Sequence, residues 1–132
     1  MLNPFPDLLA FGLLAPFLFR MVSGLCYLFL GFSSFRDPLL NQTRLLRLMS
    51  PGYRYAVGTL FILGSLFLIL GLFTQITALA LSIIVMGIIL RGFKNKAPQK
   101  PDFESLFFIA LEAITLSLVI TGAGFFAIDL PL

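Results

Sequence analysis

Four long apolar stretches, separated by short gaps, take up most of this 132-residue chain. A helix of about 18 or more apolar residues can cross a bilayer, because it rises ~1.5 Å per residue and the hydrocarbon layer is ~30 Å thick. Hydrophobic residues make up 59% of the chain, charged residues only 11%, and the mean hydropathy is +1.04. A water-soluble core of this size cannot bury so much apolar surface. The sequence therefore predicts a small protein that crosses a membrane several times.

The apolar stretches are continuous rather than alternating, and they are longer than the strands of a membrane barrel. Backbone groups in lipid must find hydrogen bonds within the protein, so the sequence predicts an all-α, polytopic four-helix bundle. We expect one domain over residues 1–132, with a tight turn at Thr74 and Gln75. The expected spans are residues 16–35, 53–73, 76–91 and 103–121. We also expect a short interfacial segment at residues 3–14 and an amphipathic, surface-lying connector at residues 36–52.

Basic residues are concentrated in two of the gaps between the apolar stretches. The N-terminal segment, the central turn and the C-terminal tail carry no Lys or Arg, but do carry Asp7 and Asp129. Since Lys and Arg favour the cytoplasmic side, we expect a cell-membrane protein with both basic loops in the cytoplasm and both termini outside. The net charge of +3 is then explained by topology and by contacts with anionic lipids, and no nucleic-acid partner is expected. The eight basic residues in or next to these two gaps are Arg36, Arg44, Arg47, Arg54, Arg91, Lys94, Lys96 and Lys100.

The chain has no histidine and one cysteine, Cys26, inside the first span. An intramolecular disulfide and a CxxC redox pair are therefore excluded. Imidazole acid–base chemistry is also excluded, and we expect neither a metal site nor an intrinsic cofactor. We interpret Cys26 as a small apolar filler, because burial in hydrocarbon suppresses the reactive thiolate.

Two ionisable residues fall inside the predicted spans, where each charge costs roughly 2.5–3.5 kcal/mol on insertion scales. Arg20 lies about one turn inside the first span, and Glu112 lies near the middle of the fourth, on one face with Ser105 and Thr115. The long side chain of Arg20 has the reach to approach Glu112 or Asp129. Three interpretations stay open: an ion pair that joins helices, a ligand or proton site, and extension of Arg20 to water beside a protonated Glu112.

Small residues recur at four-residue spacing in the last two spans. Such stripes let membrane helices approach closely, so we interpret them as packing faces. The third span carries Thr74, Ala78 and Ser82, and the fourth carries Ala113, Ser117 and Thr121.

Three segments resemble the DoxX family of small four-helix membrane proteins. The first is RMVSGLCYLFLG, in which Arg20, Gly24 and Gly31 match the family's opening helix. The second is GSLFLILGLFTQITALAL, which includes Gly64 and Gly71. The third is TGAGFFAID, which resembles the family's terminal motif and contains Gly122, Gly124 and Asp129. The resemblance covers roughly residues 16–129 and implies the four-helix fold.

The chain departs from the family pattern at three polar positions. Leu30 and Ser34 stand where the family often has His and Lys, and Phe61 stands where it tends to carry Glu. The family includes a membrane subunit of thiosulfate:quinone oxidoreductase. The resemblance therefore implies a redox-associated subunit that binds a quinone or a small sulfur species, with Arg20 stabilising an anion. Its partners would be other membrane or cytoplasmic redox subunits.

Two other functions fit the sequence. Short loops and packing stripes also suit a non-catalytic assembly or scaffold subunit. A membrane carboxyl group at Glu112 suits a small proton-coupled transporter that acts as a homo-oligomer.

Overall fold

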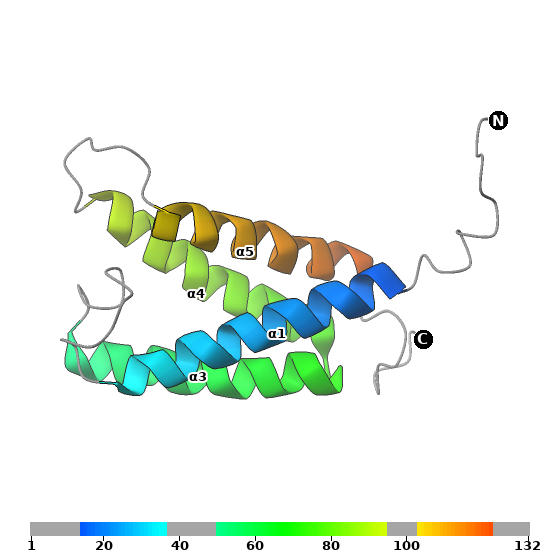
Figure 1. The fold of residues 1–132 in the computed structure, drawn as a ribbon, viewed down its shortest axis with the longest axis horizontal. Coiled ribbons are helices and arrows are strands. Elements are labelled where there is room, and N and C mark those ends of the chain that lie inside the picture. The colour runs from blue at the N-terminus through cyan, green and yellow to red at the C-terminus, as the bar shows by residue number, and fades with distance from the viewer. Residues whose placement is uncertain (1–13, 37–49, 95–102, 123–132) are drawn as a thin grey trace.

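The computed structural model describes residues 14–36, 50–94 and 103–122, and the side chains of the second range as far as Arg91. The described parts form helices α1 (Leu14–Phe35), α3 (Pro51–Leu70), α4 (Thr74–Lys94) and α5 (Phe103–Thr121) (Figure 1). The predicted all-α, four-helix fold is confirmed. Residues 3–13 of the predicted interfacial segment lie outside the described residues, and its last residue, Leu14, begins α1. Residues 37–49 of the predicted connector also lie outside the described residues.

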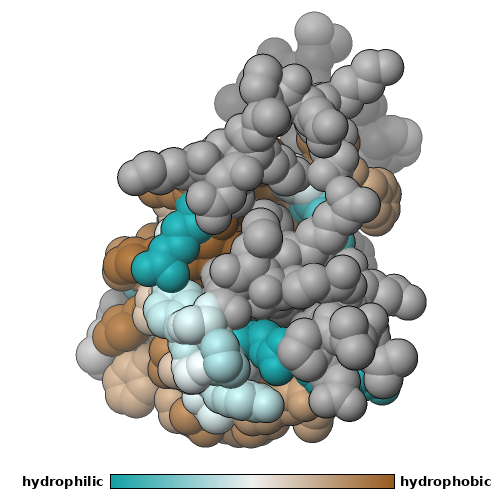
Figure 2. Space-filling model, turned by 90° about the vertical axis from the view of Figure 1, so that its left-hand side faces the viewer, coloured by the Kyte–Doolittle hydropathy of each residue, from teal (hydrophilic) through white to brown (hydrophobic). Residues whose placement is uncertain are grey.

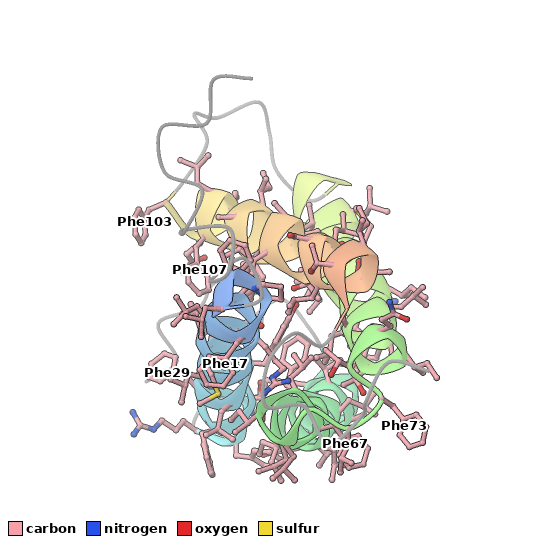
Figure 3. The ribbon with its side chains drawn as sticks, turned by 90° about the vertical axis from the view of Figure 1, so that its right-hand side faces the viewer. Phe17, Phe29, Phe67, Phe73, Phe103 and Phe107 are labelled. Carbon is pink, nitrogen blue, oxygen red and sulfur yellow. The ribbon has the colours of Figure 1, made fainter. Side chains whose placement is uncertain are left out.

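All four helices are long and apolar enough to cross a membrane. Their outer surface is covered by large apolar side chains, such as Phe29 at 70% exposed, Phe103 at 84% and Ile120 at 84%. Figure 3 shows Phe29, Phe67, Phe73 and Phe103 pointing away from the bundle. An apolar exterior of this extent is stable in lipid and not in water, so the chain is a multi-pass membrane protein.

The helices pack in a ring in which each one contacts two neighbours: α1 with α3, α3 with α4, α4 with α5, and α5 with α1 (Figure 1). The short turn between α3 and α4 makes that pair antiparallel. The interior is built from aromatic and aliphatic residues of all four helices. Its fully buried members include Tyr27, Phe61, Leu68, Val85, Ile88, Phe108 and Leu118.

Glycines bring α1 and α3 close together. A Cβ built on Gly58 would lie 2.7 Å from Ser34 Cβ, and one built on Gly31 would lie 3.1 Å from the Gly58 carbonyl oxygen. Gly24 faces Ile69 of α3 in the same way, with 2.8 Å to its Cγ1. These contacts leave no room for side chains, as is usual where membrane helices associate closely.

The turn between α3 and α4 lies three residues earlier than predicted. Gly71 adopts a left-handed conformation (φ 70°), which glycine takes without a steric penalty. Its N–H donates to the Leu68 carbonyl and the Leu72 N–H donates to Phe67, so the pair forms a Schellman cap that ends α3. Thr74 and Gln75, expected in the turn, are the first residues of α4.

The two stripes of small residues have different environments. Thr74, Ala78 and Ser82 are buried, so this stripe of α4 faces the bundle interior. On α5, Ala113 is exposed and Ser117 is half-buried. The α5 stripe faces away from the interior of this bundle, because Phe108, Leu111, Glu112, Thr115 and Leu118 occupy the buried face.

Candidate functional site: a buried polar cluster in mid-membrane

Buried hydroxyl groups in this bundle follow two patterns. Most donate back to a carbonyl of their own helix, as Ser34 does to Leu30 and Ser65 does to Ile62. This arrangement satisfies a hydroxyl in lipid without a second helix. Between described residues, two side-chain hydrogen bonds instead cross from one helix to another, Ser82 to Glu112 and Tyr27 to Thr115. We call Tyr27, Ser82, Glu112 and Thr115 the polar cluster.

Glu112 is the tenth of the 19 residues of α5 and is 5% exposed. Its Oε1 accepts a hydrogen bond from the Ser82 hydroxyl of α4, whereas its Oε2 is buried and has no hydrogen-bond partner. A buried polar atom without a partner is costly in an apolar environment. The carboxyl group is therefore oriented through one oxygen and keeps the other available to a proton or a ligand.

Tyr27 and Thr115 form a second polar link, between α1 and α5. The Thr115 hydroxyl donates to the Leu111 carbonyl at 2.7 Å, so it accepts the Tyr27 hydroxyl, also at 2.7 Å. Both side chains are fully buried. Because Thr115 follows Glu112 by three residues on the buried face of α5, the two cross-helix links are adjacent.

Aromatic rings form an apolar wall beside these groups. The rings of Tyr27 and Phe61 have their centroids 5.4 Å apart, with an angle of 47° between their planes. Phe61 and Phe108 are fully buried. The polar cluster therefore lies against buried aromatic side chains in the apolar interior of the bundle.

Arg20 is buried at 1% exposed, but the structure does not pair it with Glu112. Its guanidinium carbon lies 5.4 Å from the centroid of the Phe17 ring. Helices α1 and α5 are antiparallel and are joined by the Tyr27–Thr115 bond. Arg20 lies seven residues from Tyr27 on one side of this bond. Glu112 lies three residues from Thr115 on its other side. At ~1.5 Å per residue, these ten residues separate the two levels by about 15 Å, beyond the reach of an ion pair.

The remaining predicted residues lie apart from the cluster or outside the described chain. Gly64 packs against Leu81, 2.8 Å from a Cβ built on that glycine, and Gly122 ends α5 with φ at 77°. Cys26 is half-buried and packs against the core. Asp129 and Gly124 lie outside the described residues. Within residues 14–36, 50–94 and 103–122, no group of three His, Cys, Asp or Glu residues could hold a metal ion.

Sequence reasoning identified Glu112 but not its neighbours. Tyr27 was not among the candidates, although a tyrosine in mid-span signals that its hydroxyl needs a partner. Ser82 was expected only as a packing residue. Gly58 was not singled out, although it lies six residues before Gly64 on the same helix.

The fold and the polar cluster define a multi-pass membrane protein with a buried carboxyl group in mid-span. No family model, curated protein or solved structure matches the chain. The resemblance to the DoxX family therefore stays a prediction.

Proposed function

We propose that this chain is a redox-associated membrane subunit that binds a quinone at the polar cluster. The observation that carries the proposal is the Oε2 atom of Glu112, which is buried in mid-membrane without a hydrogen-bond partner while Ser82 holds the other oxygen. A protonated carboxyl group donates a hydrogen bond, and a quinone carbonyl accepts one. The resemblance to the DoxX family favours the same ligand class.

The residues of the cluster have distinct roles in this proposal. Ser82 orients the carboxyl group, and Glu112 holds a proton at Oε2 and exchanges it with the bound ligand. The rings of Phe61 and Tyr27 contact the flat face of the ligand. A quinone supplies two-electron redox chemistry coupled to protons, and a partner subunit provides the electrons.

The test is photoaffinity labelling with an azidoquinone on protein in lipid nanodiscs, with labelled peptides quantified by mass spectrometry. Glu112→Ala removes the carboxyl group, and labelling should fall about tenfold, as expected for a lost hydrogen bond to a buried group. Glu112→Gln keeps an acceptor for Ser82 and an N–H donor for the ligand, so labelling should stay within about threefold of the unmodified protein.

Glu104 provides the matched control, since it is the other glutamate of α5 and lies in the first turn. Labelling of Glu104→Ala should equal that of the unmodified protein. If Glu112→Ala is labelled as strongly as the unmodified protein, the quinone site is not at the polar cluster.

A second candidate is proton-coupled transport, favoured by the Tyr27–Thr115 hydroxyl pair one turn from Glu112. Both hydroxyls and the carboxyl group exchange protons, and the pair lies on the Arg20 side of Glu112. Proteoliposomes with an internal pH dye distinguish the candidates. Proton flux that Glu112→Gln abolishes would support transport, and absence of both flux and quinone labelling would favour the scaffold function.

For orientation, we propose that the end of the bundle with Arg36, Arg54 and Arg91 faces the cytoplasm of a cell membrane. The support is the concentration of basic residues on this side in the sequence. Both termini then lie on the outer side.

A further inference from the structure

Arg54 is a buried cation at the end of α3. It is 4% exposed and lies on the face of α3 that also carries Val57, Gly58 and Phe61. Its Nε has no hydrogen-bond partner, and no carboxylate of the described helices forms an ion pair with it. A buried guanidinium is unfavourable without an anion, and none of the described carboxylates supplies one to Arg54.

Helix contacts place Arg91 at the same level as Arg54. Gly64 of α3 contacts Leu81 of α4, and these helices are antiparallel. Arg54 precedes Gly64 by ten residues and Arg91 follows Leu81 by ten residues. The guanidinium of Arg91 lies 4.6 Å from the centroid of the Tyr53 ring, next to Arg54 in the chain.

Arg36 reaches the same end of the bundle from α1. Gly31 contacts Gly58 of the antiparallel helix α3. Phe35, four residues after Gly31, is therefore level with Arg54, four residues before Gly58. Arg36 directly follows Phe35. Arg36 is exposed, unlike Arg54. Figure 2, which views this end, shows hydrophilic surface next to apolar side chains.

One carboxylate of the described residues lies at this end of the bundle. Glu104, eight residues before Glu112, lies at about the same level on α5 and is half-buried. Among the described residues, three arginines therefore face one carboxylate.

We propose that Arg54, with Arg91 and Tyr53 at the rim, binds the phosphate group of an anionic phospholipid. A guanidinium matches a phosphate through two parallel hydrogen bonds, and basic pockets between membrane helices bind lipid headgroups. The surrounding surface favours a lipid over a soluble anion, since Phe35 is 44% exposed, Tyr53 38% and Leu90 61%. These apolar side chains contact the acyl chains of the bound lipid.

Native mass spectrometry after gentle detergent extraction tests this proposal. The protein is first reconstituted in equimolar phosphatidylglycerol and phosphatidylcholine, and the lipids retained by each molecule are counted. The unmodified protein should retain phosphatidylglycerol in preference. In Arg54→Gln that preference should fall about tenfold, because a charge-assisted hydrogen-bond pair is lost.

Arg36→Gln is the matched control, because it removes the same charge at the same level from an exposed position. Its preference should change less than about twofold, as is typical of an exposed charge. An equal loss in Arg36→Gln and Arg54→Gln would show diffuse attraction and overturn the site. Displacement of phosphatidylglycerol by excess inorganic phosphate would assign the site to a soluble anion and overturn the lipid proposal.

Two further variants keep the test decisive if Arg54→Gln does not fold. Arg54→Lys keeps the charge but loses the planar fork, and Arg91→Gln removes the cation at the rim. Each should retain less phosphatidylglycerol than the unmodified protein. Unchanged retention in both variants would refute the proposal.

Discussion

Ser82 of α4 donates a hydrogen bond to Glu112 of α5, and this bond is what orients the buried carboxyl group in the middle of the bundle. The other carboxyl oxygen has no hydrogen-bond partner. One side chain thus combines a fixed geometry with an unused polar atom. The bond also joins two helices that otherwise meet mainly through apolar side chains.

Removing the hydroxyl in Ser82→Ala should destabilise the bundle by about 1–2 kcal/mol, because Glu112 then has both oxygens buried without a donor. Ser65→Ala is the matched control, since Ser65 is equally buried but donates to Ile62 of its own helix. We expect its cost to stay below about 0.5 kcal/mol. Unfolding by SDS titration measures both, and equal costs would contradict a special role for the Ser82–Glu112 bond.

Tyr27→Phe should cost about 1 kcal/mol, because it removes the hydrogen bond to Thr115 without leaving a cavity. In Thr115→Val the Tyr27 hydroxyl loses its acceptor and the Leu111 carbonyl loses a donor. A double-mutant cycle over the two positions isolates the bond between α1 and α5. We expect a coupling free energy of about 1 kcal/mol, and additive effects would mean that the bond contributes nothing to stability.

Gly58→Ala should destabilise the α1–α3 contact by about 1–3 kcal/mol, because the new methyl group would overlap Ser34 Cβ at 2.7 Å. Gly87→Ala is the control, since nothing lies within 4 Å of a Cβ built there. That change should be neutral, or stabilising by up to about 1 kcal/mol, because alanine favours the helix over glycine. Comparable losses at the two positions would show that close approach does not explain the effect.

Reporter fusions test the proposed orientation. Alkaline phosphatase, which is active only outside the cytoplasm, should be active when fused after Leu132 and inactive when fused after Lys96. Green fluorescent protein, which fluoresces only inside, should give the opposite result. The reverse pattern would place Arg36, Arg54 and Arg91 on the outer side.

The sequence was sufficient to predict the helices, because continuous apolar runs leave no other structure in lipid. It was less informative about how the helices are rotated. Ala113 and Ala78 belong to similar stripes, but only Ala78 is buried, because the orientation of α5 is set by Glu112 and Thr115 meeting partners on other helices. Periodicity predicts which residues share a face of a helix, but it does not predict which neighbouring helix that face contacts.

The same limit explains why the neighbours of Glu112 in the polar cluster could not be predicted. Glu112 could be singled out because an ionisable carboxyl group is costly inside a membrane span. Ser82 lies thirty residues away and resembles any small packing residue. Arg20 seemed a natural partner by charge. The register between α1 and α5, fixed by Tyr27 and Thr115, places it at another level.

The two cross-helix bonds bear on how the protein is made. Hydroxyls such as those of Ser34 and Ser65 are satisfied within their own helix, so these two side chains need no partner helix when they enter the bilayer. Glu112 lies in α5, which follows α1 and α4 in the chain, so it is synthesised after Tyr27 and Ser82. The most polar of these residues is thus synthesised when the helix that supplies its hydrogen-bond donor is already present.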